Sequence, residues 1–247
     1  MSGAISLQMT GRFGNQLFQY AFGRAYAERF NARLHTPKWL GQTIFEIDDP
    51  LPSDQSLPIR AECESDRWMG QTNIEIRGYC MRQQSLIYTR RDAKQWFRFR
   101  PEIAQALGNV PCFHYCAHLR HGDFCGTPAF IPISKEAFLS TCDRFGIPKE
   151  QLHFVSEQTA FHVPELVVLD IGFLPDFWTL IHAKVLLRAN SSFSWWAATL
   201  GGAHRIFAPT LAGIAGSATP VDVPFVEGNW PSLSPNHAFC SDLHLSE

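Results

Sequence analysis

Short apolar segments alternate with amphipathic stretches along most of this chain. Ile5–Met9 alternates apolar and polar side chains, which predicts a strand that leads into a turn punctuated by glycines. Asn15 is the expected N-cap of the helix that follows, and this helix is predicted to end near residues 30–31. Its apolar stripe has helical spacing and consists of Leu17, Phe18, Ala21, Phe22 and Ala25.

The remainder of the first half is less regular. Residues 32–35 and 73–79 are predicted strands, because both are short and apolar or alternating. Residues 37–70 are rich in Pro, Asp, Ser and Gly, which is typical of loops with short elements. Residues 83–107 predict a helix in pieces, with a break at Arg100–Pro101 because the residue before a proline disfavours helical backbone.

From residue 111 onward, strands and helices alternate regularly. The predicted strands are residues 112–119, 152–155, 166–170, 185–188 and 205–208. The predicted helices are residues 134–145, a helix capped by Asp176 that runs to about residue 184, and residues 195–200. Such alternation predicts a parallel α/β sheet. Residues 211–247 lack periodicity and are expected to wrap over the surface. We predict two domains, an N-terminal α/β domain over residues 1–110 and a Rossmann-like domain over residues 111–247.

Composition excludes several classes of protein. The chain has 247 residues, of which 45% are hydrophobic and 18% charged, as in an ordinary folded protein. A net charge of −2 gives no indication of a nucleic-acid partner or an anionic membrane surface. No apolar run reaches the roughly 18 residues of a membrane span, and the N-terminus lacks the basic region of a signal peptide. We therefore expect a cytoplasmic protein without an integral membrane segment.

The first candidate site is the end of the predicted strand 112–119. Cys116–Ala117 precedes a charged turn, and period two would place His118 and Arg120 on one strand face, about 7 Å apart. Ligands bind at the carboxyl ends of such strands, and an arginine presents a rigid fork of donors that suits phosphate oxygens. The stretch predicts an anion site, a diphosphate in the first instance. The alternative is a structural His–Arg pair.

A metal site on the same strand is not predicted. Cys112, His114, Cys116 and His118 alternate, but a strand spreads four such side chains over about 20 Å, whereas a metal needs ligands within about 2.3 Å. The seven cysteines are an odd number without a zinc-type pair, so reduced thiols are expected.

Two further turns have the chemistry of anion sites. The turn at residues 10–16 joins a strand to a helix N-terminus, which presents backbone N–H groups, although its glycines could simply permit a tight turn. Residues 190–194 carry an amide and three hydroxyls, which can cap a helix or line an oxyanion cradle at the same sheet edge as Arg120. Trp195 and Trp196 are expected in the core, with a stacking surface for a sugar or base as the alternative.

Three stretches occur in a specific order: residues 11–20 (GRFGNQLFQY), 118–124 (HLRHGDF) and 190–196 (NSSFSWW). In this order they resemble the α-1,2-fucosyltransferase family (glycosyltransferase family 11), within the wider GT-B-fold fucosyltransferases that use GDP-fucose. Gly78–Tyr79 resembles a further family segment. The resemblance covers about residues 5–210 and implies an α/β, GT-B-like protein with two Rossmann-like domains facing a cleft. The N-terminal domain would then serve the acceptor and the C-terminal domain the donor.

The resemblance also implies roles for single residues. The implied catalytic residues are Arg120, His118 and Asp123. Arg120 would bind the donor diphosphate, His118 would orient the diphosphate and Asp123 would brace the turn. The implied donor-binding residues are Gly11, Arg12, Gly14, Asn15, Gln16, Glu157, Asn190, Ser191, Ser192, Phe193 and Ser194. Two departures stand out: His121 replaces a second arginine, and residues 154–159 lack the usual acidic pair.

The implied reaction is an inverting displacement, in which a hydroxyl of a glycan or lipid-linked sugar attacks GDP-fucose and leaves an α-linkage. It needs no cofactor, and no metal if arginine meets the diphosphate charge. Asp123 and Glu157 are the carboxylates available near the predicted edge, and neither is assigned as the general base. The alternatives are a same-fold transferase for another nucleotide sugar and a non-catalytic relative that binds a sugar nucleotide or glycan. A dinucleotide oxidoreductase is more distant, because Gly11 and Gly14 lack the third glycine of that motif.

Overall fold

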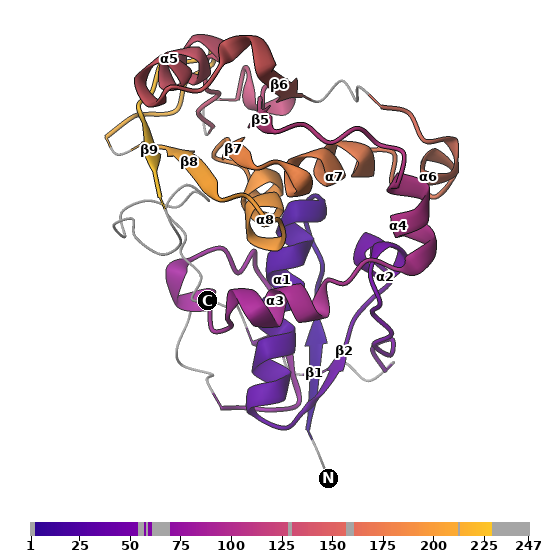
Figure 1. Ribbon diagram of the computed structural model, residues 1–247. Helices are drawn as coiled ribbons and strands as arrows, with labels where there is room; N and C mark the ends of the chain where they lie inside the picture. The colour runs from indigo at the N-terminus through magenta and orange to yellow at the C-terminus, as the bar shows by residue number, and fades with distance from the viewer. Residues whose placement is uncertain are drawn as a thin grey trace. The chain divides into compact units, whose positions relative to one another are not determined.

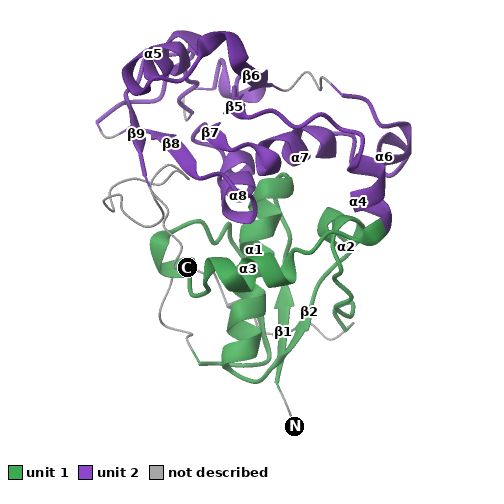
Figure 2. Ribbon diagram, in the orientation of Figure 1, with its two compact units in different colours: residues 1–101, 243–247 green, residues 102–242 purple. Residues whose placement is uncertain are grey.

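A computed structural model describes residues 3–53, 57, 59–60, 70–127, 130–156, 161–211 and 213–228. The chain divides into two compact units, one up to Pro101 and the other from Glu102 (Figure 2). The sequence placed the division at residues 110–111, and the assignment of acceptor and donor sides stays a prediction. Among the described residues, no helix is long and apolar enough to cross a membrane.

The first unit is built on a small parallel sheet in the order β2-β1-β4-β3. Its strands are β1 (Ala4–Leu7), β2 (Arg33–His35), β3 (Ile59–Arg60) and β4 (Ile74–Ile76). Its helices are α1 (Phe13–Arg29), α2 (Leu40–Ile44) and α3 (Arg90–Trp96), with a 3-10 turn, η2 (Gln83–Ser85). Gly23 allows α1 to approach β1, because a Cβ there would stand 2.5 Å from the Leu7 side chain.

Helix α1 begins at Phe13, two residues before Asn15, which was expected to be its N-cap. Arg12 is the N-cap, without a capping hydrogen bond from its side chain, so Asn15 lies in the first turn and its predicted role as N-cap is wrong. The buried Gln19 fixes the preceding loop, since its Oε1 accepts from the Thr10 N–H at 2.9 Å and its Nε2 donates to the Thr10 carbonyl at 3.1 Å. Gly11, with φ +75°, makes the turn between them.

The second unit contains a five-stranded sheet in the order β6-β5-β7-β8-β9 (Figure 1). Its strands are β5 (Tyr115–His118), β6 (Leu152–Val155), β7 (Val185–Leu187), β8 (Arg205–Pro209) and β9 (Phe225–Glu227). The first four are parallel, as predicted, and β9 is antiparallel to β8. The helices are α4 (Pro101–Leu107), α5 (Lys135–Phe145), α6 (Pro164–Val168), α7 (Leu174–His182) and α8 (Ser192–Leu200), with 3-10 turns η3 (Gly122–Phe124) and η4 (Lys149–Gln151).

Large aromatic side chains fill the interior of the second unit. Trp195 and Trp196 of α8 have no exposed surface, which confirms their expected core position. Phe138 of α5 packs against Phe225 of β9 with ring centroids 4.9 Å apart, so the last strand is tied to the main core. Burying side chains of this size contributes about 1.5–3 kcal/mol each in transfer free energy.

Three sequence predictions for the second unit are wrong. Residues 166–170 were expected to form a strand but lie in and after α6, where Val168 is 87% exposed and Pro164 begins the helix. Asp176 does not cap α7 but is a buried residue of its first turn, after the N-cap Phe173. Residues 211–247 were expected to wrap over the surface, yet residues 225–227 form β9, in which Phe225 is 1% exposed. The Arg205–Glu227 ion pair joins this strand to β8.

Candidate functional site

Two of the predicted turns leave the same edge of the second sheet. β5 ends at His118 and β7 ends at Leu187, and these neighbouring strands are parallel, with Ala117 opposite Leu187. The turn after β7 leads into α8, and the ring of its Phe193 lies 5.4 Å from the ring of His118, centroid to centroid. The structure therefore brings together the two stretches that the sequence predicted at one sheet edge.

Arg120 lies on the turn rather than on the strand face, because β5 ends two residues before it. Its side chain is 13% exposed and forms an ion pair with the carboxylate of Asp123. Its Cζ lies 5.1 Å from the ring centroid of Phe124, which stacks on Phe130 at 4.4 Å with an interplanar angle of 10°. The guanidinium is thus held between a carboxylate and an aromatic surface, which restricts its orientation.

His118 is neutral in the folded protein. Burial, with a smaller contribution from the charge of Arg120, lowers its pKa to about 3. Among the described residues its Nδ1 has no hydrogen-bond partner, and neither amide atom of the buried Asn190 has one. Buried polar groups are normally paired, and leaving one unpaired costs about 1–3 kcal/mol. These three atoms at one sheet edge can therefore bind polar groups of a ligand.

Two of the three serine hydroxyls in the turn at residues 190–194 already form hydrogen bonds within the protein. Ser191 is the N-cap of α8, where its Oγ accepts from the Phe193 N–H at 3.3 Å. Ser194 is fully buried, and its hydroxyl donates to the carbonyl of Ala189 at 3.2 Å. Ser192 is only half-buried. The side chain of Ser194 therefore stabilises the turn, and its donor-binding role remains a prediction, as it does for Ser191 and Ser192.

Sequence reasoning missed Arg188 as a site residue. It follows β7 directly at this edge and is 3% exposed, and its N–H donates to the carbonyl of Phe207 at 2.9 Å. The sequence pattern that could have identified Arg188 is the one used for Arg120, a charged residue at the end of an apolar strand. The prediction placed Arg188 within the strand, which was given as residues 185–188, and assigned it no role.

His121, the departure from the family pattern, has a structural partner. Its Nε2 lies 2.9 Å from the carbonyl oxygen of Ile133, just before α5. The imidazole thus ties the start of the Arg120 turn to its end. Glu157, the other residue of interest near β6, lies outside the described residues, so its donor-binding role stays a prediction.

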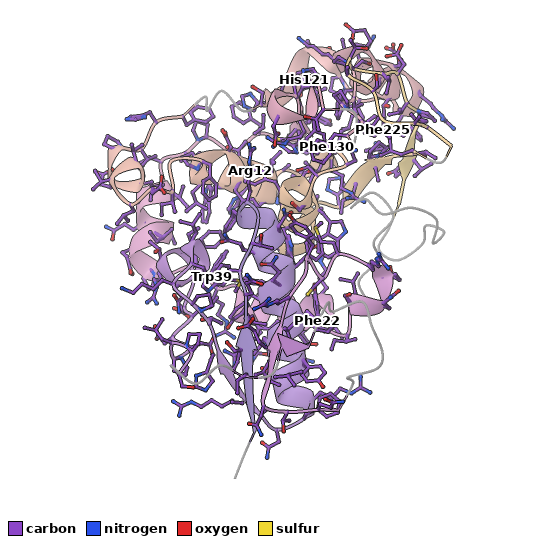
Figure 3. The ribbon with its side chains drawn as sticks, turned by 180° about the vertical axis from the view of Figure 1, so that it is seen from behind. Arg12, Phe22, Trp39, His121, Phe130 and Phe225 are labelled. Atoms are coloured by element: carbon purple, nitrogen blue, oxygen red, sulfur yellow. The ribbon has the colours of Figure 1, made fainter. Side chains whose placement is uncertain are left out.

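The predicted residues of the first unit share one loop and one helix end. Gly11 lies in the turn after β1, Arg12 is exposed at the start of α1 (Figure 3), and Gly14 and Asn15 belong to the first helical turn. Gln16 closes the loop, because its Nε2 donates to the Gly11 carbonyl at 3.1 Å. These residues are together in their unit, at the carboxyl edge of its sheet.

The cysteines and histidines form no metal centre in the part of the chain that the structure describes, where no three potential ligands gather. Cys80, Cys112, Cys116, Cys125 and Cys142 are reduced and form no disulfide. Burial raises the pKa of Cys116 to about 12, so this thiol is not a nucleophile at neutral pH.

Searches with protein-family models and curated proteins found no match. Solved structures do match. Fucosyltransferase NodZ from Bradyrhizobium aligns with a TM-score of 0.53 and 14% identity, over 92% of this chain and 99% of that one. A mutant of Arabidopsis thaliana FUT1 in complex with GDP aligns with a TM-score of 0.55 and 9% identity, over 84% and 70%. The chain has the GT-B fold of these enzymes. At such low identity the likeness extends to the fold alone.

Proposed function

We propose that this protein is a glycosyltransferase that moves fucose from GDP-fucose to a sugar hydroxyl. The observation that carries the proposal is the shared edge of β5 and β7, where the neutral His118 and the buried Asn190 lie at the N-terminus of α8 and the turn that contains Arg120 begins. The fold adds support, because structures with this fold include two of the α-1,6-fucosyltransferase NodZ, one soaked with GDP-fucose and one co-crystallized with GDP.

The reaction would be a direct displacement. The acceptor oxygen attacks the anomeric carbon of β-linked GDP-fucose, the bond to the diphosphate oxygen breaks, and GDP leaves as an α-linkage forms. Negative charge grows on the departing diphosphate, where the oriented guanidinium of Arg120 and the N–H groups of α8 would meet it. The acceptor proton passes to a base that we leave unassigned.

Asp123 and His118 would serve this step without transferring protons. The carboxylate of Asp123 pairs with Arg120, which fixes the direction of the guanidinium fork. With a pKa of about 3, His118 stays neutral through the physiological range, so it would bind the nucleotide by hydrogen bonding. The donor charge would be met by arginine, so the proposed reaction includes no metal.

The finer assignment is an α-1,2 linkage to a glycan or lipid-linked acceptor, which rests on the three ordered motifs. NodZ, which shares the fold, is an α-1,6-fucosyltransferase, so fold likeness does not favour one linkage over another. Product analysis by methylation and mass spectrometry would determine the linkage.

Nucleotide binding tests the proposal most directly. We expect GDP to raise the melting temperature more than UDP, ADP or NAD, because a ligand at 100 times its Kd adds about 2.7 kcal/mol of stability. Transfer of radiolabelled fucose from GDP-fucose to a panel of glycans completes the test. Equal or tighter binding of UDP would favour the alternative, a same-fold transferase for another nucleotide sugar. Binding of GDP without transfer or hydrolysis would favour a non-catalytic relative.

A further inference from the structure

Tyr79 occupies an unusual position in the first unit. It follows β4, and β4 lies beside and parallel to β1, so Tyr79 and the loop around Gly11 leave the same carboxyl edge of the sheet. Ligands of α/β proteins bind at such edges. A donor-binding role of the loop does not by itself account for an aromatic side chain at this position.

The ring of Tyr79 is exposed, whereas its neighbours are anchored. It is 46% exposed, and among the described residues it is the one Phe, Tyr or Trp that is exposed rather than buried or half-buried. Cys80, the next residue, is 1% exposed. A single exposed apolar side chain is ordinary on a protein surface, so exposure alone indicates nothing. Here, however, the backbone presents the ring.

The backbone on both sides of Tyr79 is left-handed. Gly78 has φ +103° and Cys80 has φ +53°. For a non-glycine residue, such a conformation persists only where the surrounding structure determines it. Tyr79 thus lies between two residues with left-handed backbone, and its side chain is at the surface.

The ring also lies close against the loop after β1. A Cβ on Gly11 would stand 3.1 Å from Cε1 of Tyr79 and 2.5 Å from Nδ2 of Asn15. Glycine at position 11 is therefore required for this contact, in addition to its positive φ. The loop supports one edge of the ring, so the ring is held in place while almost half of its surface stays accessible.

We propose that Tyr79 is a stacking surface for a pyranose ring of the acceptor. The proposal rests on the proposed glycosyltransferase function. One face of a pyranose carries mostly C–H groups, whose slight positive charge complements the negative face of an aromatic ring. The phenol oxygen can exchange a hydrogen bond with a sugar hydroxyl beside it. Tyr79 belongs to the first unit, whereas His118, Arg120 and Asn190 belong to the second. The ligand assigned to Tyr79 is the acceptor, because a pyranose presents a C–H face to such a ring, and a loss of GDP affinity on its removal would contradict this assignment.

The test compares Tyr79→Ala, Tyr79→Phe and a control, Leu51→Ala, which truncates a side chain of the same unit that is 55% exposed. The probes are lactose, cellobiose and N,N′-diacetylchitobiose, measured as acceptors with GDP-fucose and as ligands by saturation-transfer NMR. We expect Tyr79→Ala to raise the KM or Kd of the best probe at least about tenfold, a change of about 1.4 kcal/mol. Tyr79→Phe should stay within about threefold, because it keeps the ring face.

GDP affinity, measured by calorimetry, shows whether Tyr79 binds the acceptor or the nucleotide. It should change less than about twofold in all three variants. An unchanged acceptor KM in Tyr79→Ala, a loss of GDP affinity instead, or an equal effect of Leu51→Ala would overturn the inference. So would a wild-type protein that neither binds nor modifies any probe. If wild type binds a probe that Tyr79→Ala does not, yet transfers no fucose, the proposed function fails and the stacking site stands.

Discussion

Replacing Arg120 separates a catalytic guanidinium from a structural one. Its contacts include an ion pair with Asp123, whose side chain is 41% exposed, and the ring of Phe124. A partly exposed ion pair contributes about 0.2–1 kcal/mol, and a cation–π contact at such a site about 0.5–1 kcal/mol. Arg120→Ala should therefore cost about 1–2 kcal/mol of folding stability, which corresponds to a fall in melting temperature of about 2–8 °C.

The expected effect on turnover is much larger. Removal of one preorganised donor of this kind typically lowers the rate by about 10²–10³. Arg120→Lys should recover little, because an ammonium on a flexible stem cannot reproduce a planar fork that rests on Phe124 and binds two oxygens. The assay is the melting temperature, the calorimetric Kd for GDP and the rate of transfer from GDP-fucose, all on the same preparations of wild type, Arg120→Ala and Arg120→Lys.

One result would refute the reasoning. If Arg120 were a buried structural partner, its removal would leave an uncompensated charge and cost about 3–5 kcal/mol, with GDP affinity unchanged. Full activity of Arg120→Lys would likewise show that a point charge is sufficient. Asp123→Asn is the matched control, because it keeps the guanidinium but weakens its orientation, and an intermediate loss of turnover is expected.

Three further predictions concern single side chains. Between pH 6.5 and 3 His118 is neutral in the folded protein but protonated in the unfolded chain, so its contribution to stability is full above pH 6.5 and falls by up to about 1.4 kcal/mol per pH unit below it. The free energy of unfolding of His118→Gln should therefore depend less steeply on pH than that of wild type, and an equal dependence would contradict the assigned pKa. Gln19→Leu leaves both backbone groups of Thr10 unpaired and should cost about 1–3 kcal/mol in urea denaturation, whereas no loss would mean that the loop does not depend on this amide. His121→Arg removes a hydrogen bond to the carbonyl of Ile133, so we expect a slightly lower melting temperature and no tighter GDP binding, and a clear gain in affinity would show that position 121 faces the nucleotide.

Where the chain carries both the start and the stop residues of a helix or strand, the sequence by itself determined that helix or strand. Helix α5 follows its prediction closely, because Ser134 accepts from the Ala137 N–H at 3.0 Å as the N-cap and Gly146 ends the helix in the left-handed conformation. Strand β6 has its predicted bounds, since Leu152–Val155 is a short apolar run between turns. The order of the polar turns along the chain also came from sequence, and with it the choice of Arg120.

Only the tertiary structure decided which apolar segments pair and where site side chains point. Val168 has strand-like neighbours but lies at the end of α6, which begins at Pro164, whereas residues 225–227 pair with β8 as the antiparallel strand β9. The setting of Arg120 depends on the Phe124–Phe130 stack, and the Phe130 carbonyl accepts from the N–H of Ser217, far along the chain. Contacts between such distant residues leave no local pattern in the sequence, because they arise only when the chain has closed on itself.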